Sequence, residues 1–90
     1  MRILGYIKHP TYLVTVFRME DKFSIQFEKG LLVQTYKYRS GPLLSNMREL
    51  EAMVTPPYLA EVEKVFLSMD ETRAKHIPVL EDEDEFQDII

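Results

Sequence analysis

Two histidines, His9 and His76, are the side chains best suited to acid–base chemistry near neutral pH. Neither has a second His or a Glu at the HxH, HxxxH or HxxE spacing that metal sites and catalytic helices use. None of the four serines lies in a GxSxG turn, the three glycines form no phosphate-binding loop, and the absence of Cys excludes thiolate nucleophiles, disulfides and cysteine-based zinc sites. The sequence therefore predicts a protein that is not an enzyme and that holds no cofactor or metal ion.

The stretch EDEDEFQDII, residues 81–90, is the most strongly charged part of the chain. A calcium loop of the EF-hand type needs alternating oxygen ligands, a glycine at its sharp turn and a glutamate at its twelfth position, and this stretch provides neither the glycine nor the length. Acids followed by large apolar residues are similar in kind to the acidic C-terminal peptides of bacterial single-stranded-DNA-binding proteins. We expect a mobile tail that docks a partner through Phe86, Ile89 and Ile90, or one that packs back on the domain.

Basic residues are concentrated in the first half of the chain. Residues 1–48 hold eight Lys or Arg and three Asp or Glu, whereas residues 49–90 hold three and twelve. The formal net charge of −4 is therefore mainly a property of the tail and does not exclude an anionic partner for the rest of the protein. The candidate contacts to nucleic acid or another anion are cations in or beside expected strands, namely Lys8, Arg18, Lys22, Lys37 and Arg39.

Aromatic residues accompany these cations in the expected strand 31–39, where Lys37 and Arg39 share one face and Tyr36 and Tyr38 share the other. Sheets that present rings beside cations bind single-stranded nucleic acid by stacking and by phosphate contacts. The expected element order resembles the repeat of the purine-rich-element-binding and Whirly proteins, and this resemblance of architecture implies single-strand binding on a curved sheet. The acidic tail would then act as an autoinhibitory lid. The alternation leaves open whether the tyrosines face solvent or the core.

Four segments have the pattern of β-strands. Residues 22–28 alternate strictly between polar and apolar, so Phe23, Ile25 and Phe27 should point into the core. Residues 2–8, 11–19 and 31–39 are rich in β-branched and aromatic residues. The connections between these segments are short, and Gly30 supplies the left-handed backbone of a tight turn, so the strands should form an antiparallel meander.

Two helices should follow the strands. Asn46 with Glu49 three residues later predicts a short helix over about 46–53, and Thr55 followed by Pro56 predicts the start of a longer one over about 56–74. An apolar stripe on the longer helix predicts that it packs across one face of the sheet. That stripe consists of Leu59, Val62, Phe66 and Met69, widened by Ala60 and Val65.

These patterns predict one α+β domain over residues 1–77, with a four-stranded antiparallel meander and a short and a longer amphipathic helix on one face, followed by an acidic tail over 78–90. The start MRILGYIKHP lacks the apolar core of a signal peptide, and no apolar run reaches the ~18 residues that span a bilayer. We therefore expect a cytoplasmic protein.

The function that we expect is non-enzymatic interaction with another macromolecule, most simply a protein, through the sheet or the tail. Single-stranded nucleic-acid binding is the alternative. A small enzyme or ligand-binding protein with a pocket at a dimer interface is the third. Because so small a core gains from shared burial, we also expect a homodimer.

Overall fold

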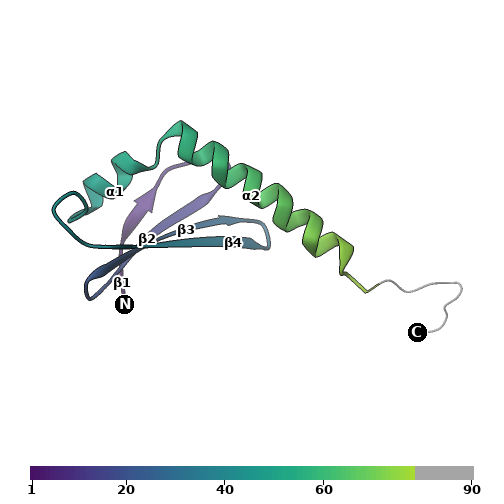
Figure 1. Cartoon of the computed structure of the whole chain (residues 1–90), viewed down its shortest axis with the longest axis horizontal. Coiled ribbons are helices and arrows are strands. Elements are labelled where there is room, and N and C mark those ends of the chain that lie inside the picture. Colours follow the sequence, from purple (N-terminus) through teal and green to yellow (C-terminus); the bar gives the residue numbers. More distant parts are fainter. Residues whose placement is uncertain (79–90) are drawn as a thin grey trace, which may run out of the picture.

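The computed structural model describes residues 1–78, and within them the predicted α+β fold is confirmed (Figure 1). The acidic tail, with Phe86, Ile89 and Ile90, lies outside the described residues. The strands pair in the antiparallel order β1-β2-β3-β4. Their bounds are β1 Arg2–Ile7, β2 Leu13–Met19, β3 Lys22–Lys29 and β4 Leu32–Arg39, and the helices that follow are α1 Met47–Met53 and α2 Pro56–Lys75.

Tight turns connect β2 to β3 and β3 to β4, and each begins with a left-handed residue. The first turn uses Glu20 with a φ of 54°, and the second uses Gly30 with a φ of 62°, as predicted for the glycine. The β1–β2 connection is longer because the backbone N–H groups of Thr11 and Tyr12 donate to His9 Nδ1, at 3.1 and 3.2 Å. These donors are therefore not available to the sheet, and β2 begins at Leu13 rather than at residue 11.

One face of the sheet forms the core. Phe23, Ile25 and Phe27 on β3 are completely buried, as their alternation predicted, and Val14 and Val16 lie beside them on β2. A register shift between Ile3 and Gly5 marks a β-bulge in β1.

Both α1 and α2 lie on this side of the sheet, and α2 continues past the ends of the strands (Figure 1). Leu50 of α1 and Val62 and Phe66 of α2 are buried against the sheet. The stripe on α2 is narrower than predicted, since Ala60 and Val65 are exposed. Within residues 1–78, no helix is long and apolar enough to cross a membrane.

The expected caps begin both of these helices. The side chain of Asn46 accepts from the Glu49 backbone N–H at 3.0 Å, and the side chain of Thr55 accepts from the Tyr58 N–H. The Glu49 carboxylate also accepts from the backbone N–H and hydroxyl of Ser45, and the backbone bond in particular lowers its pKa. Each helix start is thus fixed by a side chain that satisfies a free backbone donor.

Polar contacts beneath α2 settle the orientation of the β4 tyrosines. Gln34 Nε2 donates to the Val62 carbonyl at 2.9 Å, and the Tyr36 hydroxyl donates to Gln34 Oε1. The hydroxyls of Tyr38 and Tyr58 are 2.6 Å apart. Tyr36 and Tyr38 therefore face the helices rather than solvent.

The two turns allow a paired test of backbone strain. Glu20→Gly removes a Cβ from a left-handed residue, so the free energy of unfolding should rise by about 0.5–1 kcal/mol. Gly30→Ala should lower it by about 1 kcal/mol through the backbone alone, because an added Cβ would have no atom within 4 Å. Urea denaturation measures both, and a change of the same sign in the two variants would contradict this account of the turns.

Candidate interaction surface

The face of the sheet that no helix of residues 1–78 covers is called the open face here. It is formed by the alternate residues of each strand, and the pairing register arranges them in four rows across the strands. From the β3–β4 turn toward the β2–β3 turn, the rows are Leu13-Glu28-Val33, Tyr6-Thr15-Gln26-Thr35, Ile3-Phe17-Ser24-Lys37 and Met19-Lys22-Arg39.

Large apolar side chains occupy the β1–β2 half of the open face. Ile3, Leu13 and Met19 are 49%, 53% and 41% exposed, and Tyr6 is 60% exposed. Phe17 lies among them, directly opposite Ile3. We call these five residues the apolar patch. Because contiguous apolar surface on one face is uncommon in a monomer, the patch is the candidate binding surface.

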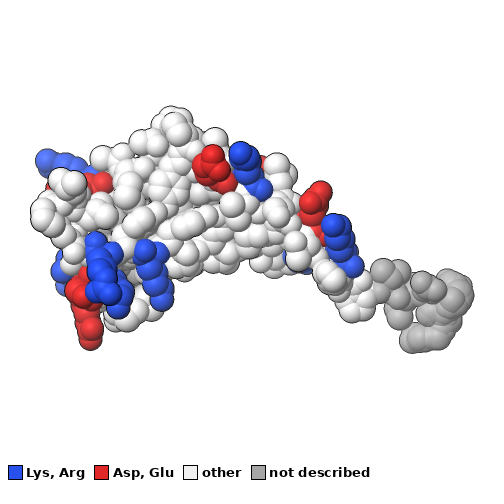
Figure 2. All heavy atoms as spheres, viewed as in Figure 1, with Lys and Arg blue, Asp and Glu red and all other residues white. Residues whose placement is uncertain are grey.

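Three cations, Lys22, Lys37 and Arg39, occupy the corner of the open face that β3 and β4 form beside the β2–β3 turn. We call this the basic corner. Lys22 and Arg39 are direct cross-strand partners, and Lys37 is in the next row. Lys and Arg side chains gather at this end of the sheet in Figure 2. Directly opposed like charges destabilise a sheet. The ion pair of Arg39 with Asp21, at 3.5 Å, offsets little of this cost because both side chains are well exposed.

Three of the five predicted anion contacts thus lie together, and two lie elsewhere. Arg18 is on the helix-covered face, where its guanidinium is 4.9 Å from the centroid of the Phe23 ring. Lys8 follows the end of β1 near the β1–β2 connection. The rings that share the open face with the cations are Tyr6 and Phe17. The register places Tyr6 opposite Thr15 and Phe17 opposite Ser24, and because of the bulge in β1 no local sequence pattern indicates the face on which Tyr6 lies.

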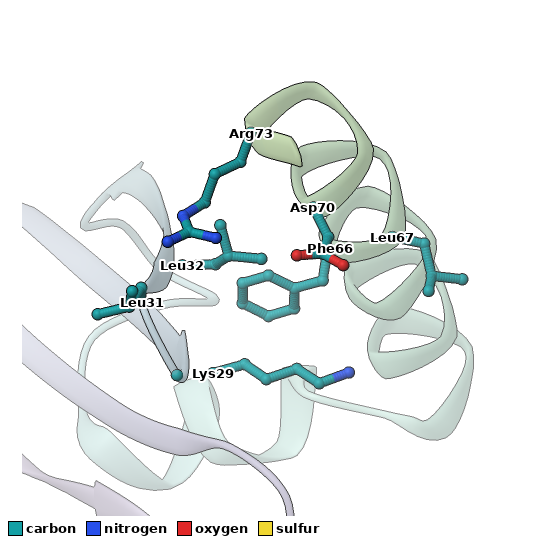
Figure 3. A pocket seen from close by; sticks show the side chains of 8 residues that line it. Lys29, Leu31, Leu32, Phe66, Leu67, Asp70 and Arg73 are labelled. Atoms are coloured by element: carbon teal, nitrogen blue, oxygen red, sulfur yellow. The ribbon is translucent and has the colours of Figure 1, made fainter. Parts of the chain in front are cut away.

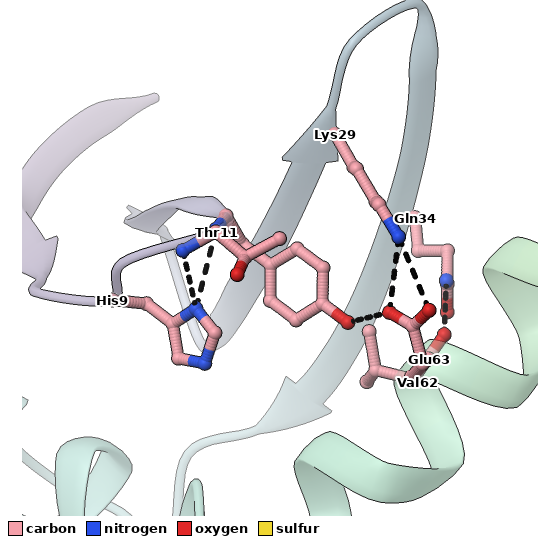
Figure 4. Close-up of polar contacts among 7 residues, drawn as sticks. His9, Thr11, Lys29, Gln34, Val62 and Glu63 are labelled. Carbon is pink, nitrogen blue, oxygen red and sulfur yellow. Dashed lines mark hydrogen bonds and ion pairs between the residues drawn. The ribbon is translucent and has the colours of Figure 1, made fainter.

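A polar network on the other side of the molecule joins the sheet to α2 (Figure 4). Glu63 accepts from the Tyr12 hydroxyl and from Lys29 Nζ, which is 3.2 and 3.1 Å from its two carboxylate oxygens. The bonds from Tyr12 and Lys29 lower the pKa of Glu63. Burial, with a smaller contribution from Glu63, raises the pKa of Tyr12 to about 12.

The histidines have local structural roles. His9 caps the β1–β2 connection through Nδ1, and its ring stacks on Tyr12 with the centroids 4.6 Å apart. His76 caps the end of α2, where its backbone N–H donates to the Arg73 carbonyl. Among the residues that the structure describes, no three His, Asp or Glu side chains are close enough together to hold a metal ion.

A cavity of about 320 Å³ lies between the β3–β4 turn and the second half of α2 (Figure 3). Its apolar wall includes Leu32 and Phe66, and the charged residues at its rim are Lys29, Asp70 and Arg73. Lys29 is already paired with Glu63. Charges of both signs at the rim select neither an anionic nor a cationic ligand.

The Glu63 network makes stability depend on pH. Because folding lowers the pKa of Glu63, its contribution is present above the ordinary value of 4.5 and is lost as the pH falls through the lowered value. In Tyr12→Phe the pKa of Glu63 should rise, and part of this acid-sensitive contribution should disappear. NMR titration of the Glu63 carboxyl carbon measures the shift, and urea denaturation at several acidic pH values measures the stability. Tyr6→Phe on the open face is the matched control, and an unchanged Glu63 titration in Tyr12→Phe would contradict the assignment.

Comparison with protein-family models, with curated proteins and with solved structures finds no match to this chain. The resemblance to the purine-rich-element-binding and Whirly repeats is accordingly one of element order, and the surface itself provides the argument for function.

Proposed function

We propose that this protein is a small non-enzymatic interaction module that binds another protein through the open face of its sheet. The observation that carries the proposal is the apolar patch. Ile3, Tyr6, Leu13 and Met19 are exposed on one face in the part of the chain that the structure describes, while Val14 and Val16 on the opposite face of β2 are buried.

The chemistry of the patch favours a protein over other partners. Fully burying a Leu, Ile or Met side chain contributes about 1.5–3 kcal/mol, and Ile3, Leu13 and Met19 keep roughly half of their surface for such a contact. Tyr6 adds a ring with a polar end, a residue type that is frequent at the centres of interfaces. Aliphatic side chains pack against other side chains, whereas nucleic-acid bases require rings on which to stack.

A charge placed within the patch tests the proposal. Leu13→Lys should keep the fold, since Leu13 is 53% exposed, and should weaken partner binding at least about tenfold by burying a charge at the contact. Leu43→Lys is the matched control, because Leu43 is 85% exposed in the β4–α1 loop and is not one of the residues of the open face. Affinity capture with the full chain compares the two variants with the unchanged protein. Equal recovery of the same proteins by Leu13→Lys and the unchanged chain would remove the open face from the proposal.

A second candidate function is single-stranded nucleic-acid binding, which is favoured by the placement of Tyr6 and Phe17 on the same face as the basic corner. Phe17 and Lys37 are in the same row, with Ser24 between them. A strand crossing this row would have a ring for a base at one end and a cation for a phosphate at the other.

Titration of the full chain with a short labelled single-stranded oligonucleotide at low salt tests this second candidate. Phe17→Ala should weaken binding because it removes a stacking surface, and Lys37→Ala should reduce the slope of log K against log salt by about 0.7. Lys64→Ala, on the exposed side of α2, is the control for loss of one positive charge. Binding that does not respond to salt, or that Phe17→Ala and Lys37→Ala leave intact, would dismiss it.

A further inference from the structure

We propose that the protein bound at the open face is a second copy of this chain, packed face to face about a two-fold axis that runs across the strands. The inference rests on the proposed function, because it names the partner of the same surface.

The axis follows from the layout of the rows. A two-fold axis between two packed sheets must lie in the plane between them, so that it turns one open face onto the other. When that axis crosses the strands, each strand lies over its own copy in the opposite direction. The first row then faces the partner's fourth row, and the second faces the partner's third.

This arrangement places four of the five patch residues on one another. Leu13 lies over the partner's Met19, and Tyr6 lies over the partner's Ile3. Phe17 lies over the partner's Thr15, which is already buried by its own neighbours. The β1–β2 half of each copy thus covers the same half of the other copy.

The charges of β3 are complementary under the same axis. Glu28 and Lys22 are six residues apart on one strand, a separation of roughly 20 Å, so they cannot pair within one chain. The axis brings Glu28 over the partner's Lys22 and Lys22 over the partner's Glu28, which forms the ion pair twice. On β4 the axis places Val33 over the partner's Arg39 and Thr35 over the partner's Lys37. These cations are on the edge strand, where long side chains can extend to solvent rather than be buried.

An axis parallel to the strands is less favourable. It would turn the apolar β1–β2 half of one copy onto the polar β3–β4 half of the other. Ile3 would then face the partner's Lys37, and Leu13 would face the partner's Glu28. Each contact would bury a charge against an apolar side chain without a partner.

The open face is large enough for a dimer of modest affinity. Strands of eight residues at about 3.3 Å per residue, spaced about 4.8 Å apart, give a face of roughly 500 Å² per copy. The pair would bury about 1,000 Å², which is the lower end for a specific interface. We therefore expect a concentration-dependent equilibrium between monomer and dimer.

Charge reversal on β3 tests the axis. Sedimentation of the full chain between about 1 μM and 1 mM should show a dimer, and Glu28→Lys or Lys22→Glu should each weaken it at least about tenfold by creating two like-charge pairs. An equimolar mixture of these two variants should restore association, because each reversed charge then meets its opposite. Lys64→Glu on α2 has the same charge change as Lys22→Glu and should leave the dimer unchanged. Circular dichroism confirms that each variant is folded.

Two results overturn the inference. In the first, the chain remains a monomer throughout this range of concentrations. If Leu13→Lys then loses partner capture, the open face binds a different protein. If the chain instead binds the oligonucleotide in a salt-sensitive way, the open face binds nucleic acid. In the second, the chain dimerises but the mixture of variants associates no better than either variant alone. The dimer would then use another surface or another axis. These results differ from failure of the proposed function itself. In that case Leu13→Lys would alter neither partner capture nor self-association.

Discussion

Tyr12 joins the sheet to α2 through two kinds of contact at once. Its ring lies between Phe27 of β3 and Phe66 of α2, with centroid distances of 6.4 and 5.4 Å, and its hydroxyl donates to Glu63 at the surface of the same helix. The apolar contact holds α2 against one face of the sheet, and the polar contact fixes how far the helix is rotated about its own axis. The exposed helical side chains and the open face both follow from this placement, because a helix docked on one face leaves the other to solvent or to a partner.

The same constraint explains why the open face differs in character from the covered one. On the covered face, Gln34 is a buried polar side chain, and it is satisfied by the Val62 carbonyl and the Tyr36 hydroxyl. On the open face, Lys22 and Arg39 oppose one another, and apolar side chains remain exposed. The opposed cations destabilise the sheet, and the exposed part of each apolar side chain adds nothing to the core. Both arrangements support the proposal that the open face binds a partner.

Local patterns predicted most of the fold, since the alternation of residues 22–28, the glycine at position 30 and the caps Asn46 and Thr55 each specify structure within a few residues. The candidate site was harder to predict from the sequence, because it depends on contacts between residues that are far apart in the chain. The β-bulge in β1 decides which of its side chains reach the open face, and the sequence gives only the weak signal of Gly5. Arg18 could not be placed before the register was known. The bond from Tyr12 to Glu63 spans 51 positions, and no local pattern indicates it.

The chain order of the elements also has a consequence for biosynthesis. All strand pairings link neighbours through short connections, so the meander can form soon after β4 leaves the ribosome, whereas Phe66 emerges 27 residues after the end of that strand. At about 5–20 residues per second, the face that α2 later covers is unprotected for roughly 1–5 s. During this interval both faces of the nascent sheet expose apolar side chains, whereas in the folded chain only the open face does. Charged residues such as those at the end with the β2–β3 turn are of the kind that oppose aggregation of an exposed sheet.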